Sequence, residues 1–146
     1  MKSKIYSALL MITAVIFVSC DNDDENQPSI VGRWAGDKAE FRMNLIPFDD
    51  DNFDVVLEFE SDGTVTYTDD DQSYSGTYTV HEKTLQITGV TVAGMPIDVS
   101  GNYNIKEISN TDLVIEGERE GEINDPTFGN ISGTVRATLY FTRLSQ

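Results

Sequence analysis

The hydrophobic and polar residues that follow Ile30 alternate in a pattern typical of β-strands. Val, Ile, Thr, Tyr and Phe recur at every second position, and short runs of Gly, Asp, Asn and Ser interrupt them. Signals for helices are nearly absent over the same stretch. We therefore predict eight strands, with ends defined to about 2–4 residues: Val31–Leu45, Asp54–Glu60, Thr64–Thr68, Tyr74–His81, Thr84–Val92, Ile97–Ile108, Asp112–Gly121 and Ser132–Leu144.

The first predicted strand changes its alternation part of the way along. Trp34 occupies an even position, whereas Phe41 and Met43 occupy odd positions, so a regular strand would place them on opposite faces. Gly36 lies between the two sets. A β-bulge at this glycine would turn both sets toward the interior.

The connections between the predicted strands are mostly short enough for hairpins. An antiparallel meander of eight strands either closes on itself or leaves two exposed edges. Eight is also the number of strands at which an up-and-down barrel has room for core side chains or for one small ligand. We predict an all-β fold, an eight-stranded antiparallel up-and-down barrel over residues 30–146, with a β-sandwich as the alternative.

The N-terminus has the three zones of a secretion signal. Lys2 and Lys4 form its charged start, Ile5–Val18 is largely apolar, and the small residue Ser19 precedes Cys20. A helix over the apolar zone would reach only about 21 Å at ~1.5 Å per residue, which is less than the ~30 Å hydrocarbon core of a bilayer. We therefore expect residues 1–19 to be a signal peptide and not a permanent membrane span.

Cys20 is the single cysteine of the chain. Phe17-Val18-Ser19-Cys20 resembles the bacterial lipobox, although Leu is usual where Phe17 stands. The resemblance implies cleavage before Cys20 and acyl chains on this residue, and two or more acyl chains give a stable membrane anchor. We expect the lipid on Cys20 to be the partner that attaches the chain to a membrane.

The acidic run Asp21–Glu25 follows the lipobox and predicts a hydrated, self-repelling linker within residues 20–29. It also resembles the export tract behind the lipidated cysteine in surface lipoproteins of the Bacteroidetes type, while a plain spacer is the alternative. The resemblance implies an outer-membrane lipoprotein at the cell surface, with the periplasmic face as the alternative location.

Gly32-Arg33-Trp34 resembles the Gly-x-Trp signature of lipocalins. In that family the Trp plugs the closed end of the barrel, often beneath an Arg near the end of the last strand. Arg143 occupies the corresponding place here, where its guanidinium would cover the indole. The signature residues implied by the resemblance are therefore Gly32, Trp34 and Arg143.

Three further stretches add to this likeness, namely residues 57–64, 76–80 and 85–87. Their succession resembles the lipocalin-like domains of secreted bacterial lipoproteins over roughly residues 30–144. The Thr-Asp-Tyr motif of larger lipocalins is not evident, nor is their flanking helix. This departure argues against a large internal cavity.

The chain carries a formal net charge of −15. Removal of residues 1–19 takes away two lysines and leaves 8 basic and 25 acidic residues, a net charge of −17. Such a charge repels phosphates, so we expect neither nucleic-acid binding nor direct docking on anionic headgroups.

The acidic residues gather at one end of the predicted barrel. Successive connections of a meander alternate between its ends, so residues 61–63, 82–83 and 109–111 form one tight end. Residues 46–53, 69–73, 93–96 and 122–131 form the opposite, mostly long-looped end. We predict an acidic mouth there, made by Asp49, Asp50, Asp51, Asp69, Asp70, Asp71, Glu122 and Asp125.

The simplest role of the acidic mouth is solubility, and binding of a cationic or neutral ligand is an alternative. A calcium site is another, because Ca²⁺ takes six to eight oxygen ligands. An EF-hand is excluded, since the sixth place counted from Asp49 holds Asp54 where that loop needs Gly. A free fatty-acid carboxylate would be repelled at such an entrance. We expect no cofactor and no confident metal site, with calcium as the alternative.

Catalytic chemistry finds little support in the sequence. His81 is the single histidine and lies at the tight end, and no His or Cys cluster has zinc spacing. Glu116, Glu118, Glu120 and Glu122 alternate along one strand, which is typical of a solvated outer face. We therefore predict that the protein is not an enzyme.

Two functions fit these observations. The first is a binding module that holds a small apolar or amphipathic molecule in the barrel. The second is a protein-interaction or inhibitor module of a cell-surface complex, which acts through the acidic mouth loops. Candidates for lining a ligand are Phe41, Met43, Phe59, Tyr67, Tyr78 and Tyr103.

Overall fold

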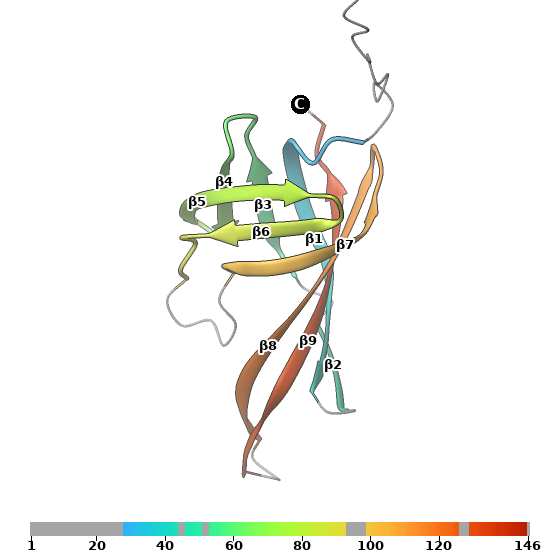
Figure 1. The fold of residues 1–146 in the computed structure, drawn as a ribbon. Coiled ribbons are helices and arrows are strands. Elements are labelled where there is room, and N and C mark those ends of the chain that lie inside the picture. The colour runs from blue at the N-terminus through green and yellow to red at the C-terminus, as the bar shows by residue number, and fades with distance from the viewer. Residues whose placement is uncertain (1–27, 44–45, 51–52, 93–98, 126–128, 146) are drawn as a thin grey trace, which may run out of the picture.

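The computed structural model describes residues 28–43, 46–50, 53–92, 99–125 and 129–145. The expected signal peptide, Cys20 and nearly all of the tether lie outside these ranges. No helix among the described residues is long and apolar enough to cross a membrane. The described residues form nine strands (Figure 1): β1 (Gly32–Met43), β2 (Ile46–Asp50), β3 (Val55–Phe59), β4 (Thr64–Asp69), β5 (Gln72–His81), β6 (Thr84–Thr88), β7 (Gly101–Ile108), β8 (Asp112–Asp125) and β9 (Gly129–Arg143).

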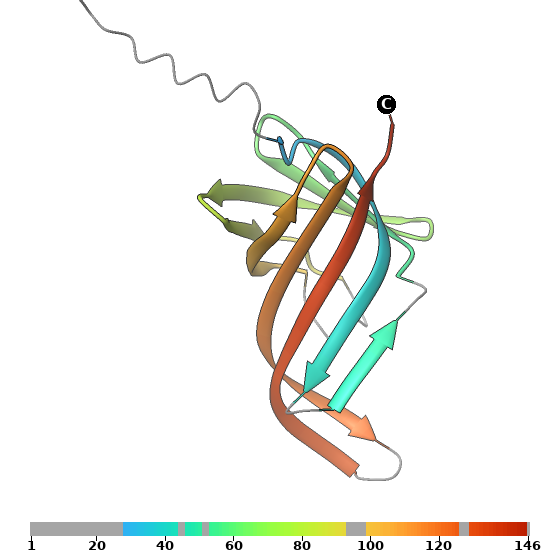
Figure 2. The ribbon, with the colours of Figure 1, turned by 90° about the vertical axis from the view of Figure 1, so that its right-hand side faces the viewer.

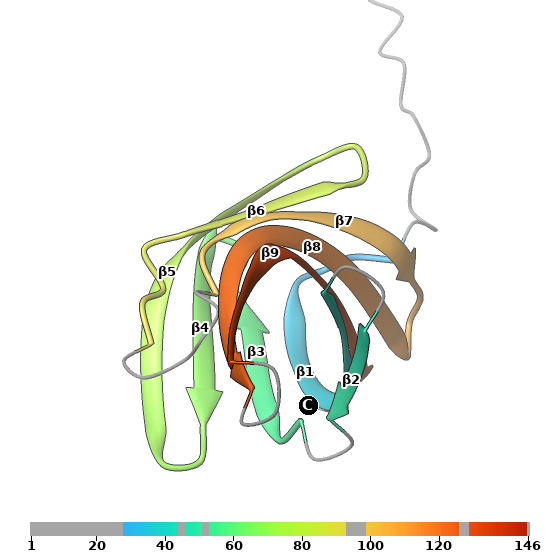
Figure 3. The ribbon, with the colours of Figure 1, turned by 90° about the horizontal axis from the view of Figure 1, so that it is seen from below.

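The strands close into one antiparallel barrel. Each strand from β3 to β9 pairs with its neighbour in the chain, and β9 also pairs with β1. The first half of β1 pairs with β3, and its second half pairs with β2 along the same edge. Figure 3 shows the resulting ring from one end. The predicted eight-stranded all-β barrel is confirmed, and the sandwich is not observed.

Short turns join the strands at one end of the barrel, as predicted. This end, which we call the base, carries the β3–β4, β5–β6 and β7–β8 turns; in Figure 1 the β3–β4 and β7–β8 turns lie at the top and the β5–β6 turn lies at the right. The opposite end is called the mouth. At the mouth, however, the connection expected at residues 69–73 is a two-residue turn, Asp70–Asp71, with Asp70 at a φ of 50°. Asp is among the residues that tolerate this left-handed conformation.

Two regions predicted as mouth loops are largely strand. Residues 46–50 form β2, which pairs with β1 from Met43 back to Ala39 and covers backbone groups that β3 leaves unpaired. Residues 122–125 and 129–131 continue the ladder between β8 and β9 as far as the pair Asp125 and Gly129. Conversely, β6 ends at Thr88 and β7 begins only at Gly101, so both are shorter than predicted.

The long strands project beyond the barrel. Figures 1 and 2 show β8, β9 and the second half of β1 running past β3–β7 with β2 at their side. We call this projection, residues 39–43, 46–50, 121–125 and 129–137, the arm. A meander of equal strands would have no arm, and sequence alternation alone does not show that one hairpin is longer than the others.

The expected bulge in β1 is present. The register with β9 shifts between Gly36 and Lys38, so Asp37 is the extra residue. Trp34 is fully buried on one side of the shift, and Met43 is buried on the other. A Cβ on Gly36 would lie 2.5 Å from the carbonyl oxygen of Phe53, which explains the need for glycine. The bulge therefore brings both sets of residues inward.

Apolar side chains fill the barrel on the base side. The fully buried ones include Trp34, Phe59, Leu113 and Phe141, and Phe53 packs against the ring of Phe141 with 5.7 Å between centroids. No residue among those described is both buried and polar or charged, apart from the aromatic phenols. The core therefore extends without interruption to the base.

Candidate functional site

The base is sealed by Trp34 and Arg143. The indole nitrogen of Trp34 donates a hydrogen bond to the carbonyl oxygen of Ile30 at 2.8 Å. The guanidinium carbon of Arg143 lies 4.0 Å from the centroid of the indole, close enough for a cation–π interaction. Arg143 also donates hydrogen bonds to the carbonyl oxygens of Ser29 and Val31. These contacts tie the first described residues to the last strand.

Gly32 makes the approach of Arg143 possible. The φ of Gly32 is 133°, a conformation that favours glycine, and a Cβ there would lie 2.7 Å from Nη1 of Arg143. The three signature residues Gly32, Trp34 and Arg143 thus lie together at the base.

Two of the ligand-lining candidates belong to the base as well. Phe59 is fully buried, and its ring meets that of Tyr78 edge to face at 4.9 Å. The hydroxyl of Tyr78 donates a hydrogen bond to the carbonyl oxygen of Glu60 at 2.8 Å, so it points to the β3–β4 turn. Both rings are used in packing. The prediction that they line a ligand site is therefore not supported by their positions.

Phe41 and Met43 lie on the arm. Met43 is buried and Phe41 is half-buried, and β1 pairs them with Ala137 and Val135 of β9. Neither residue belongs to the hydrophobic cluster that fills the barrel. They face the inner side of the arm, beyond the mouth.

Tyr67 and Tyr103 are the lining candidates that the structure places in the mouth half of the barrel. Tyr67 is buried and packs against Tyr74 with 6.4 Å between ring centroids. Burial raises the pKa of Tyr67 well above its usual value, and repulsion from Asp69 and from the Tyr74 and Tyr103 phenols, once these ionise, raises it further. The phenols of Tyr74 and Tyr103 therefore lie within electrostatic reach of that of Tyr67.

Arg119 is an inward-facing residue that sequence reasoning missed. It shares the inner face of β8 with the buried residues Leu113, Ile115 and Gly117. Its Nη2 donates a hydrogen bond to the hydroxyl of Tyr103 at 3.1 Å, and its guanidinium carbon lies 5.5 Å from that ring's centroid. The signal was present in the alternation, because every second residue from Leu113 leads to Arg119.

Two glycines make room for the Arg119–Tyr103 pair. A Cβ on Gly101 would lie 2.1 Å from Nη2 of Arg119, and Gly101 has a φ of 148°. A Cβ on Gly117 would lie 2.8 Å from the ring of Tyr103. The hydroxyl of Tyr103 in turn donates a hydrogen bond to the carbonyl oxygen of Val99 at 2.7 Å, which points the phenol toward the mouth.

The predicted acidic residues lie on separate projections and not around one rim. Asp69, Asp70 and Asp71 lie at the β4–β5 turn, whereas Glu122 lies on the arm (Figure 1). The backbones of Asp49 and Asp50 belong to β2 and that of Asp125 ends β8, and Asp51 lies outside the described residues. The prediction of acidic loops is wrong for these strand residues, because the arm extends the ladder through them.

Among the described residues, no group of three or more His, Cys, Asp or Glu side chains is placed to hold a metal ion. The glutamates of β8 lie on its outer face, where Lys106 pairs with Glu116 at 3.0 Å and Arg136 pairs with Glu118. Both pairs are largely open to solvent. They form a charged surface and not an acid–base pair.

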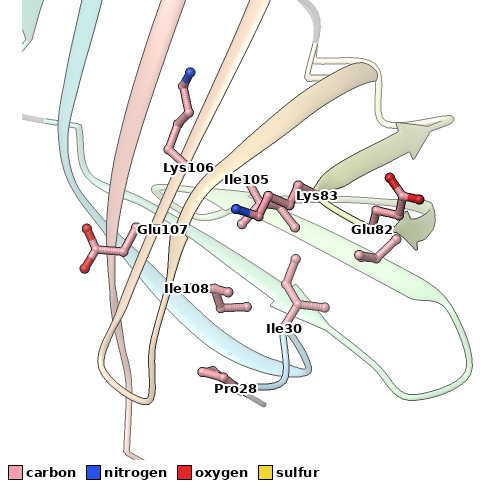
Figure 4. A pocket seen from close by; sticks show the side chains of 9 residues that line it. Pro28, Ile30, Glu82, Lys83, Ile105, Lys106, Glu107 and Ile108 are labelled. Carbon is pink, nitrogen blue, oxygen red and sulfur yellow. The ribbon is translucent and has the colours of Figure 1, made fainter. Parts of the chain in front are cut away.

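A concave surface feature lies at the base. It is an open groove of about 560 Å³ between the first described residues, the β5–β6 turn and the end of β7 (Figure 4). In Figure 4 the charged ends of Lys106 and Glu107 point away from Ile30. The groove is lined by Pro28, Ile30, Val80, Glu82, Lys83, Ile105, Lys106, Glu107 and Ile108.

A closed antiparallel barrel with a Gly-x-Trp base under an arginine defines a recognisable class of small β-barrel domain. The chain matches the model of a lipocalin-like domain over residues 30–115, which is more than half of its length, and it belongs to this family. The match ends within β8, so Arg119 and Arg143 lie beyond it. No curated protein and no solved structure matches the chain.

Proposed function

We propose that this protein is a lipid-anchored binding module that holds a small amphipathic molecule at the mouth half of its barrel, without catalysis. The observation that carries this proposal is the contrast along the barrel's inner face. Apolar side chains fill the base side, whereas the phenols of Tyr67 and Tyr103 and the guanidinium of Arg119 lie toward the mouth. Such a mixture of aromatic surface and a few polar groups is typical of small-molecule sites.

The proposal of a non-catalytic role rests on the positions of the reactive residue types. His81 is exposed at the β5–β6 turn of the base, far along the strand from the mouth. The paired glutamates of β8 face solvent. We therefore assign the inward-facing groups a role in binding and none in catalysis.

The proposed attachment rests on the sequence Phe17–Cys20 and on the place where the tether enters the fold. Residue 28 lies at the base, next to the Trp34 plug. The ten residues from Cys20 through Ser29 span at most about 33–36 Å. A lipid on Cys20 would keep the base near the membrane and leave the mouth toward the aqueous side, in our proposal at the surface of an outer membrane.

Native mass spectrometry of gently purified protein tests the binding function. We expect a fraction of the protein to carry a small molecule that denaturation releases. Protein that is free of small molecules, and that takes up none from an extract of the producing cells, would contradict the proposal.

Fractionation of cells that express wild type or Cys20→Ser tests the anchor. We expect the wild type in the membrane fraction and Cys20→Ser in the soluble fraction. Equal distribution of the two proteins would overturn the proposed anchor without affecting the proposed binding function.

A further inference from the structure

Arg119 and Arg143 both lie on inward-facing positions, but their charges are satisfied to different extents. Arg143 covers an indole at 4.0 Å and donates hydrogen bonds from both terminal nitrogens to backbone carbonyls, while its Nε is buried without a partner among the described residues. Arg119 donates one hydrogen bond to a described residue, the hydroxyl of Tyr103. The guanidinium has five N–H donors. Four of these donors have no hydrogen-bond partner among the described residues.

None of the ion pairs found among the described residues includes Arg119. All four lie on the outer surface and join Arg33 to Glu58, Lys38 to Glu40, Lys106 to Glu116, and Arg136 to Glu118. This is notable in a chain with 25 acidic residues, where carboxylates outnumber cations. Arg119 is half-buried, so its guanidinium is accessible to an anion from outside the barrel.

The surrounding residues are shaped to keep Arg119 in this position. Gly101 leaves the space that Nη2 occupies, and Gly117 leaves room for the ring of Tyr103 beside the guanidinium. Arg119 lies opposite Val135 on β9, near the start of β7, where the barrel passes into the arm. A molecule that enters from the mouth would meet the guanidinium before it reaches the apolar core.

We propose that Arg119, oriented by Tyr103, is the anion-recognising residue of the site and binds the negatively charged head of the amphipathic ligand. This inference rests on the proposed binding function and adds the charge of the ligand to it. Arginine recognises carboxylate, sulfonate and phosphate oxygens through paired hydrogen bonds, which is a geometry that lysine lacks. The expectation that a fatty-acid carboxylate would be repelled at the mouth is revised accordingly. The acidic residues do not form one rim, and the inner face offers a cation.

Two fluorescent probes with the same rings test the inference. They are 1-anilinonaphthalene-8-sulfonate, which is an anion, and N-phenyl-1-naphthylamine, which is neutral. The mature chain with Cys20→Ser is titrated without detergent. We expect Arg119→Gln, which keeps a donor for Tyr103 but loses the charge, to weaken binding of the anion about tenfold or more, in line with a charged hydrogen bond. Binding of the neutral probe should change less than twofold.

Matched variants make the result specific. Arg136→Gln removes the same charge from the outer face of the next strand and should leave both affinities unchanged. Arg119→Lys should restore part of the affinity for the anion. If Arg119→Gln weakens both probes equally, Arg119 only shapes the mouth, and the inference is wrong while the proposed function stands.

Two further outcomes are decisive. If neither probe binds the wild type saturably, the proposed function itself fails. If Arg119→Gln does not fold, the comparison is made on the wild type alone. The anion must then bind at least tenfold more tightly than the neutral probe despite the protein's negative charge, and equal affinities would overturn the inference.

Discussion

The two inward-facing arginines lie at opposite ends of one barrel and differ in what surrounds them. At the base, Arg143 lies on the indole of Trp34 and is held by backbone carbonyls. At the mouth, Arg119 has a phenol beneath it and a single hydroxyl partner among the described residues. The same side chain thus completes the packing at one end and remains available for an interaction at the other.

This difference places the residues that stabilise the fold at the base, and the residues that we propose recognise a ligand at the mouth. The base contains the fully buried rings, so its interactions contribute mainly to the free energy of unfolding. In the mouth half Tyr67 and Tyr103 also belong to the core, whereas Arg119 is half-buried and its removal would leave no large gap. Substitutions at the two ends should therefore affect different measurements, and the following predictions compare them from the largest expected effect to the smallest.

Trp34→Ala should have the largest effect. It removes the fully buried indole, the hydrogen bond to Ile30 and the surface on which Arg143 lies. Truncation of a buried Trp typically costs about 3–5 kcal/mol. Urea unfolding of this variant should show a loss of that size, and Arg119→Gln should lose much less. A loss below about 1 kcal/mol for Trp34→Ala would show that the base is not the main source of stability.

Arg143→Leu should lower stability by about 1–3 kcal/mol, because it removes the cation–π contact and two hydrogen bonds to backbone carbonyls. Arg119→Leu, its counterpart at the mouth, should change stability by less than about 1 kcal/mol, since it removes one hydrogen bond from a half-buried side chain. Thermal unfolding of the two variants measures the difference. Equal destabilisation would remove the distinction between the arginines.

Alkaline pH should destabilise the protein partly through Tyr67. The pKa of Tyr67 is raised in the folded state, first by burial, whereas the unfolded chain ionises near the ordinary value of 10.0. The stabilising contribution is thus complete below pH 10 and is lost as the pH rises above it, at on the order of 1.4 kcal/mol per pH unit for one tyrosine. Unfolding free energies measured between pH 9 and 11 should fall less steeply for Tyr67→Phe. Parallel slopes for both proteins would argue that Tyr67 ionises normally.

Glu116→Gln should have the smallest effect. Its partner Lys106 is half-exposed on the outer face, and surface ion pairs contribute about 0–1 kcal/mol. In a chain of net charge −15, loss of one carboxylate also relieves repulsion. We expect a change in stability within about 0.5 kcal/mol in either direction. A loss of several kcal/mol on urea unfolding would show that the outer face contributes more than its exposure indicates.

The alternation of the sequence was sufficient to predict the barrel, the tight turns of the base and the bulge beside Gly36. These features depend on the alternation within each strand and on the turn residues, which can be recognised in each strand separately. The geometry of Trp34 with Arg143 followed from the family resemblance, since no local pattern links residues so far apart.

The arm and the role of Arg119 were not predicted, for two different physical reasons. The length of β8 and β9 depends on pairing with each other, and their polar, glycine-containing ends resemble a loop in composition. Arg119 lies on an inner face that it shares with Gly117, and neither residue carries a hydrophobic signal. The neighbouring residues Glu118 and Glu120 identified the outer face correctly. That Arg119 faces inward follows only when the buried residues before it on the same strand are known.

The ladder between β1 and β9 has a consequence for the order in which the protein can fold. The hydrogen bond from Arg143 to Val31 joins residues 112 positions apart, so the barrel cannot close until the last strand has been synthesised. Contacts between such distant residues form slowly because a long loop must close first. For a chain that we propose is exported, this delay would be useful: the polypeptide would remain open while it is threaded through a translocation channel and would complete its structure only after the C-terminus has crossed.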